Sequence, residues 1–365
     1  MNKQETMGYK IANAENLEKE NNAEQQTLNA LSNEYGLSTL KFLKEPEKGI
    51  SSKNLIVSSE DGSSYFIKCF KKADAERVNV SENAVCFIGE NSDLPVVLPL
   101  KNKEGGLHVV IDGKTYSIFP NMPHVQYSPE SVSEWTTLSK KLGQFLGKIH
   151  LVSQLAVIPE TIEMISRWTP DDPKEAIAKY EKIKSIIERK TATDEYDQKA
   201  LEFIQLKTDL IAQNEFIKRE QQPLVVCHGD YHKDNLLLNE QGEITGICDW
   251  DISGKANPYV EFVRSFSMCV IRRDFEHLQD KKEMAKAFLD GYKSNCGFVF
   301  DIEELKYAIE SWYQKLLTAP WPLPDHYYSL SDANKTDNIL YSEYNKVIFL
   351  RDRRAELAEL IESCM

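Results

Sequence analysis

The chain has 365 residues, of which 41% are hydrophobic and 28% charged, and its formal net charge at pH 7 is −13. This is the composition of a soluble globular protein with one large or two ordinary domains, and its acidic balance argues against a nucleic-acid partner while being compatible with a cationic small substrate. The seven cysteines are scattered and include no C-x-x-C pair, which predicts reduced thiols. The polar start predicts no signal peptide, and the lack of any run of about 18 apolar residues predicts no membrane span. Together these features predict a cytoplasmic protein.

The N-terminal third is predicted to be rich in strands. Residues 1–30 form a polar segment, which we expect to be frayed or weakly helical over most of its length. Leu28, Leu31 and Tyr35 recur at helical spacing. A first strand is expected at 39–43, and turn signals at Glu60-Asp61-Gly62 and Asp112-Gly113 predict two hairpins. The four hairpin strands are expected at 54–59, 63–70, 108–111 and 116–119.

Lys68 stands among apolar residues in the second strand of the first hairpin. An unpaired charge that is buried costs several kcal/mol, so a half-buried lysine here needs a partner. The alternative is an edge-strand lysine whose ammonium reaches solvent. A helix with apolar positions at Ala84, Val85 and Ile88 follows this strand.

The remainder of the chain is predicted to be mainly helical. Apolar residues at helical spacing end at His150, which we interpret as a packing or capping residue. Two charged amphipathic helices with solvated faces are expected within 173–220, broken near 191–193. Further helices are expected at 259–273, 279–294, 302–318 and 337–362, with loops at 254–258 and around 319–328.

Three short apolar runs between Val225 and Asp251 are interpreted as strands that end at one rim of a sheet. Asp230 and Asn235 follow the first run, and Asp249 ends the third. Two carboxylates and a neutral oxygen ligand at strand ends can converge on Mg²⁺ and on a hydroxyl that loses its proton. The alternative is a buried hairpin with polar ends.

The segments HGDYHKDN and CDWD, as they stand here, resemble the catalytic loop and metal-binding aspartate of the aminoglycoside phosphotransferase and choline kinase superfamily. The resemblance covers about residues 45–315. It implies an α+β, protein-kinase-like fold of two lobes: an N-lobe with an antiparallel sheet at 31–121, and a larger, mainly helical C-lobe at 122–365. The chain has no Ala-Pro-Glu segment of the kind that protein kinases carry.

The resemblance also implies roles for single residues. Asp230 would accept the proton of the acceptor hydroxyl, and Asn235 and Asp249 would hold Mg²⁺. Lys68 would hold the ATP phosphates and pair with Glu82, for which Glu76 is a competitor.

Weaker expectations concern the nucleotide loop, the connection between the lobes and the acceptor. Ser51 and Ser52 lie where kinase-like chains cover the phosphates. Pro120 offers a carbonyl and Met122 an N–H to adenine. Asp251 and Glu261 are assigned to the substrate side. For Asp251 the alternatives are contact with a second metal ion and bracing of the loop, and Glu261 stands where relatives carry the aspartate of an Asp-Leu-Ala segment.

The function implied by the resemblance is ATP- and Mg²⁺-dependent phosphorylation of a hydroxyl on a small molecule: an aminoglycoside, an aminoalcohol or a homoserine-like acceptor. Two alternatives remain, a nucleotide-binding scaffold without turnover and a kinase-like enzyme that modifies protein. Carboxylates and aromatic residues between 310 and 332 suit a cationic acceptor, although simple packing of the last helices is the plainer interpretation.

Overall fold

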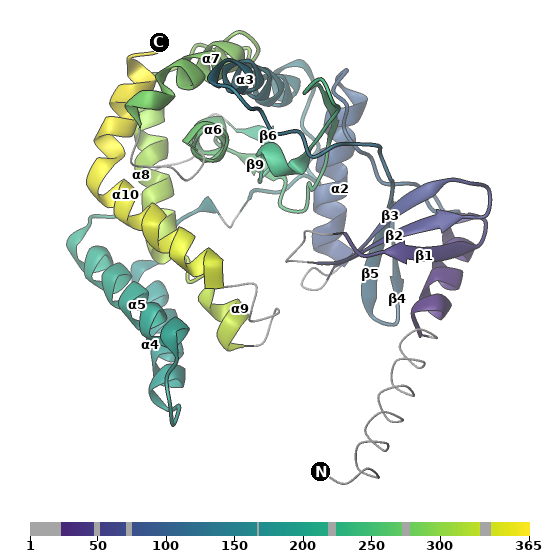
Figure 1. Ribbon diagram of the computed structural model, residues 1–365, viewed down its shortest axis with the longest axis horizontal. Helices are drawn as coiled ribbons and strands as arrows, with labels where there is room; N and C mark the ends of the chain where they lie inside the picture. The colour runs from purple at the N-terminus through teal and green to yellow at the C-terminus, as the bar shows by residue number, and fades with distance from the viewer. Residues whose placement is uncertain are drawn as a thin grey trace. The chain divides into compact units, whose positions relative to one another are not determined.

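The computed structural model describes residues 23–46, 52–70, 75–165, 168–217, 224–271, 278–328 and 337–365. It divides into two compact units (Figure 1). Unit 1 consists of Met1–Glu82 with Val97–Met122, and unit 2 consists of Asn83–Val96 with Pro123–Met365. Most of the expected polar N-terminal segment, and Ser51 with it, lies outside the described residues.

Unit 1 is built on an antiparallel sheet of five strands in the order β1-β2-β3-β5-β4. A helix over 23–35 packs Leu28, Leu31 and Tyr35 against the sheet, as their spacing predicts. Both predicted hairpins are present, β2 with β3 and β4 with β5. The strands are β1 (Leu40–Lys44), β2 (Ser52–Ser59), β3 (Ser64–Phe70), β4 (His108–Ile111) and β5 (Lys114–Pro120).

Helix α2 (Ala75–Glu90) includes the predicted apolar positions, and Ala84, Val85 and Ile88 join the core of unit 2. The apolar residues at 94–100 do not form a regular strand, and Val96 makes only an isolated bridge with Ile247. Pro95 and Pro99 interrupt this run, and each removes a backbone donor that a strand would need.

Unit 2 is mainly helical, and most of its helices agree closely with the predicted ranges, although α3 (Val132–Leu155) continues beyond His150, where its apolar pattern was expected to end. Ser131 begins α3 with a reciprocal capping box to Glu134. Helices α3 and α7 run side by side (Figure 1), and a Cβ on Gly143 would lie 2.0 Å from the carbonyl oxygen of Phe288, so this packing requires glycine. The long helices are α3 (Val132–Leu155), α4 (Pro173–Glu188), α5 (Glu195–Gln213), α7 (Lys282–Lys293), α8 (Ile302–Thr318) and α10 (Asp337–Glu362).

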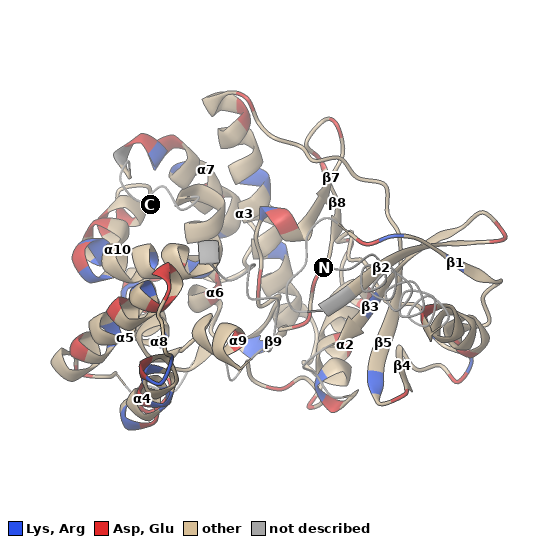
Figure 2. Ribbon diagram, turned by 60° about the horizontal axis from the view of Figure 1, so that its bottom comes forward, with Lys and Arg blue, Asp and Glu red and all other residues tan. Residues whose placement is uncertain are grey.

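Acidic and basic residues are interspersed along α4, α5 and α10 (Figure 2), in keeping with the charged faces expected for the two helices within 173–220. A short helix, α9 (Leu323–Tyr327), lies in the segment expected to be a loop. Among the described helices, none combines the length and the apolar character needed to cross a bilayer.

The short strands around the predicted catalytic loop correct the sequence interpretation. They lie in two separate pairs rather than at one rim of a single sheet: β6 (Val225–Cys227) with β9 (Gly254–Ala256), and β7 (Leu236–Leu238) with β8 (Ile244–Ile247). The strand β9 lies where a loop was expected. A strand of three residues is too short to leave a recognisable pattern in the sequence. The strand β9 forms because its backbone pairs with that of Val225 to Cys227 in β6.

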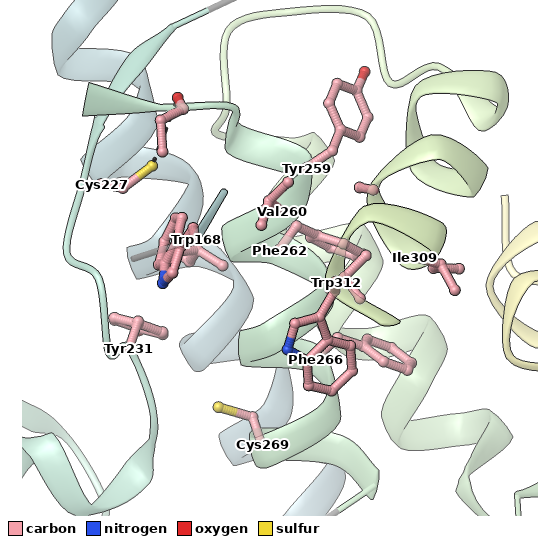
Figure 3. Close-up of a cluster of buried hydrophobic side chains, with 14 of the residues drawn as sticks. Trp168, Cys227, Tyr231, Tyr259, Val260, Phe262, Phe266, Cys269, Ile309 and Trp312 are labelled. Carbon is pink, nitrogen blue, oxygen red and sulfur yellow. Dashed lines mark hydrogen bonds between the residues drawn. The ribbon is translucent and has the colours of Figure 1, made fainter. Parts of the chain in front are cut away.

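Helix α6 (Pro258–Phe266) follows β9 and continues as one turn of π-helix, η3 (Ser267–Ile271). Figure 3 shows how this helix is anchored: Val260, Phe262 and Phe266 project from it into a buried cluster with Trp312 of α8 and Cys227 of β6. The fold therefore fixes α6 against β6, the strand that leads into the predicted catalytic loop.

Candidate active site

The loop after β6 turns sharply at Gly229, whose φ is +93°. A side chain is excluded at this position twice over, because the left-handed conformation disfavours it and a Cβ would lie 2.4 Å from the carbonyl oxygen of Ile252. The turn presents Asp230 next, as a partly exposed side chain. The glycine in His-Gly-Asp is thus a requirement of the backbone.

Glu261 holds this loop from the first turn of α6. Its Oε1 accepts the backbone N–H of Gly229 at 2.6 Å, and its Oε2 accepts the backbone N–H of His228 at 3.1 Å and contacts His150 Nε2 at 2.8 Å. Burial would raise the pKa of the Glu261 carboxyl, but the hydrogen bonds from His150 and from the backbone N–H of Gly229 outweigh it, so the pKa lies below its ordinary value. The side chain is 1% exposed, and it therefore presents no surface to a substrate, contrary to the role expected for it.

His150 completes this brace from α3. Its Nδ1 lies 2.7 Å from the hydroxyl of Tyr292 on α7, and its side chain is fully buried, as expected for a packing histidine. His150, Cys227 and Glu261 bring three potential metal ligands together. The carboxylate is already occupied by backbone donors, and burial raises the pKa of the Cys227 thiol well above its usual range, so the group acts as a hydrogen-bonded support for the loop.

Asp230 lies between two basic side chains. His232 Nε2 is 3.4 Å from its Oδ2, and Arg264 Nη2 is 3.3 Å from its Oδ1. Burial would raise the pKa of Asp230, but the contact with His232 and the charge of Arg264 outweigh it and hold the pKa well below the usual range. Arg264 also donates to the carbonyl of Gly229 and lies over the ring of Trp168, 5.0 Å from its centroid. Asp230 is therefore ionised at neutral pH and fixed in orientation.

Asn235 connects Asp230 to the β7–β8 hairpin. Its side-chain nitrogen donates to the carbonyl of Asp230 at 2.8 Å, and its own carbonyl accepts the N–H of Cys248 at 3.0 Å. Asp249 follows Cys248 directly and is exposed, with a left-handed backbone at φ +63°. Such a conformation is uncommon for residues other than glycine and is concentrated at functional sites.

His228 ties the two ends of this arrangement together. Its Nε2 donates to the carbonyl of Cys248 at 2.9 Å, and its Nδ1 accepts the N–H of Asp230 at 3.2 Å. Burial lowers the pKa of the imidazole, which agrees with a neutral ring that donates on one side and accepts on the other. The structure thus brings Asp230, Asn235 and Asp249 into one connected network, with Asp251 in the turn beyond it.

Unit 1 contains the residues expected to hold phosphate. Lys68 on β3 is buried, which excludes the exposed-lysine alternative, and it lies directly across the ladder from Ser117 on β5. Glu82, also buried, accepts a hydrogen bond from Ser117 Oγ at 2.7 Å and contacts His108 Nδ1 on β4 at 2.8 Å. Glu82 rather than Glu76 therefore reaches the strand position of Lys68.

Three more of the expected nucleotide contacts lie at or near the ends of strands in unit 1. Ser52 begins β2, Pro120 ends β5, and Met122 is the last residue of unit 1. Nucleotide contacts by these residues and by Ser51 stay predictions.

Sequence reasoning missed four residues of these networks: Arg264, His232, His108 and Ser117. Arg264 had a local signal, because it follows Glu261 by three positions on a helix and so shares its face. His232 lies two residues after Asp230. The partners of His108 and Ser117 lie 26 and 35 residues away in the chain, where no local pattern links them.

One family model matches most of the chain. The model of the phosphotransferase enzyme family matches residues 43–306. Amicoumacin kinase in complex with AMP-PNP and Ca²⁺ is similar in structure, with a TM-score of 0.57 at 16% identity over 91% of this chain and 95% of that one. No curated protein sequence matches this chain significantly.

Two further structures have the same TM-score of 0.57. Spectinomycin phosphotransferase in complex with ADP and spectinomycin is 18% identical over 93% of this chain and 98% of that one. A microcompartment-associated aminopropanol kinase is 13% identical over the same shares of the two chains. These likenesses establish the expected kinase-like fold.

Proposed function

Because this chain belongs to the phosphotransferase enzyme family, we propose that it transfers the γ-phosphoryl group of ATP, with Mg²⁺, to a hydroxyl of a small molecule. The observation that carries the proposal is the hydrogen-bonded network that connects Asp230, Asn235 and Asp249. The side chain of Asn235 donates to the carbonyl of Asp230, and the backbone of Cys248, the residue before Asp249, is bonded to Asn235 and His228. The similar structures of amicoumacin kinase and spectinomycin phosphotransferase contain AMP-PNP and ADP, respectively, which supports ATP as the donor.

Asp230 would orient the acceptor hydroxyl and take its proton as the new O–P bond forms and the bond to ADP breaks. Its depressed pKa makes it a weak base, so its main contribution is orientation, with the proton accepted late in the transfer. Arg264 and His232 hold the carboxylate in place for this role. Phosphoryl transfer depends mostly on positioning and charge stabilisation, and a rigid carboxylate meets the first need.

The residues fit a magnesium site. Asp249 supplies an exposed carboxylate, and Asn235 uses its side-chain nitrogen for Asp230, so its side-chain oxygen is the atom that a hard cation would contact. When bound, Mg²⁺ neutralises charge on the phosphates. In unit 1, Lys68 would contact the phosphates, with Glu82 as its partner.

Release of ADP, measured across aminoglycosides, aminoalcohols, homoserine and sugars, tests the proposal. We expect acceptor-dependent ADP release with at least one class, and its loss in the matched variant Asp230→Asn. ATP binding without turnover on any class would support the scaffold alternative instead. Phosphate incorporated into protein, and into none of the small molecules, would support the protein-modifying alternative.

A further inference from the structure

We propose that His108, on the edge strand β4, is a positioning residue that holds the Glu82 carboxylate at the strand position of Lys68 and thereby sets the affinity for nucleotide. The inference rests on the proposed phosphate-binding role of Lys68 and deepens it. All groups involved belong to unit 1.

The first support is the register of the sheet. Lys68, Ser117 and His108 lie side by side on β3, β5 and β4, because Ser117 is the ladder partner of both other residues. Residues directly opposite one another in an antiparallel ladder project on the same face. The three side chains therefore form one row, and Glu82 reaches that row from α2.

The second support is how Glu82 is bound within the row. Ser117 donates to its Oε1 at 2.7 Å, and His108 Nδ1 lies 2.8 Å from its Oε2. An ionised carboxylate only accepts hydrogen bonds, so His108 must carry its proton on Nδ1 to make this contact. With one donor on each oxygen, the carboxylate has a fixed orientation.

The third support is that His108 is itself braced. Asn102 donates to the carbonyl of His108 at 3.2 Å, and the hydroxyl of Tyr35 donates to the carbonyl of Leu107 at 2.9 Å. Burial raises the pKa of Tyr35, and the charge of Glu82 raises it further, so this hydroxyl stays protonated and able to donate. An edge strand has a single neighbour in the sheet, and these bonds fix the part of β4 that carries His108.

The test compares three substitutions by the dissociation constant and the KM for Mg·ATP, with thermal stability followed in parallel. His108→Leu removes the donor and should raise both constants about five- to tenfold, the loss expected for one intramolecular hydrogen bond, while leaving the KM of the acceptor unchanged. His108→Asn places an amide N–H where Nδ1 stood and should restore affinity to within about twofold. Val110→Gln, an exposed change on the same strand, is the matched control.

A nucleotide affinity for His108→Leu equal to that of the wild type would overturn the proposal, as would equal losses for His108→Leu and His108→Asn. If His108→Leu simply fails to fold, His108→Asn and Ser117→Ala still decide it, since the first should bind nucleotide normally and the second weakly. Lys68→Met separates this inference from the proposed function. Unchanged nucleotide affinity in Lys68→Met would count against the phosphate site itself, whereas a loss there without a loss in His108→Leu would count against His108 alone.

Discussion

Glu82 in unit 1 and Glu261 in unit 2 are both buried carboxylates, but they are stabilised by different kinds of hydrogen-bond donor. Each has a histidine nitrogen 2.8 Å from one oxygen. The other donors differ, because Glu261 accepts from the backbone N–H groups of His228 and Gly229, whereas Glu82 accepts from the hydroxyl of Ser117. A backbone N–H can only donate, but a hydroxyl can also accept.

Because of this difference, the hydrogen-bond donors around Glu261 are rigid, whereas those around Glu82 can adjust. Fixed donors around Glu261 hold the turn that presents Asp230, and they demand a full carboxylate. Side-chain donors around Glu82 adapt to a change in the group they bind. We therefore expect the two residues to respond differently to the same substitution.

The substitution Glu→Gln, made separately at both positions, should lower the free energy of unfolding more at Glu261 than at Glu82. Glu261→Gln turns an amide NH₂ toward donors that cannot accept, and should lower the free energy of unfolding by about 3 kcal/mol, the scale for breaking a buried pair. Glu82→Gln should lower it less, by about 1 to 2 kcal/mol, because Ser117 or His108 can accept from the new amide N–H, although the proposed partner Lys68 loses its countercharge. Urea unfolding of both variants measures this, and equal losses would contradict the distinction.

A third buried charge, Lys207 on α5, sharpens the comparison because it is poorly compensated. Its ammonium donates to the carbonyl of Ala319 at 2.8 Å and lies 4.1 Å from the centroid of the Phe203 ring. Burial lowers the pKa of Lys207 to about 7, with the charge of Glu343 opposing the shift. The folded protein therefore loses this proton above about pH 7, while the unfolded chain keeps it until near its ordinary value of 10.5.

In that window the unfolded state binds more protons, so stability attributable to Lys207 rises with pH. The free energy of unfolding of the wild type, relative to Lys207→Met, should increase by about 1 kcal/mol per pH unit between pH 7 and 9. The exposed substitution Lys182→Met on α4 is the control. A difference between wild type and Lys207→Met that is constant with pH would show that the buried amine does not titrate in this range.

Much of this could be predicted from the sequence, and what was missed has a physical reason. Helix α8 has the predicted limits because its apolar periodicity is long, and the hairpins follow from turn residues beside apolar runs. Helix α10 also has the predicted limits, although its backbone is kinked at Arg353. The strand β9 and its pairing with β6 were missed because a three-residue strand depends on a partner about 30 residues away.

The candidate site shows the same division. Asp230, Asn235 and Asp249 were found because a catalytic loop keeps its residues at fixed spacing along the chain. Glu261 was recognised as important but given the wrong surroundings, since nothing local reveals that its carboxylate faces the backbone of residues 228 and 229. Arg264 and His108 act through contacts between distant segments, which only the folded chain brings together.

The central claim, that Asp230 serves phosphoryl transfer rather than nucleotide binding, is tested most directly by one paired measurement. Mg·ATP affinity by calorimetry and turnover at saturating acceptor are determined for the wild type and Asp230→Asn. For Asp230→Asn we predict the same nucleotide affinity within about twofold and a kcat lower by about 10²- to 10⁴-fold. A kcat near that of the wild type, or a parallel loss of nucleotide affinity, would contradict it.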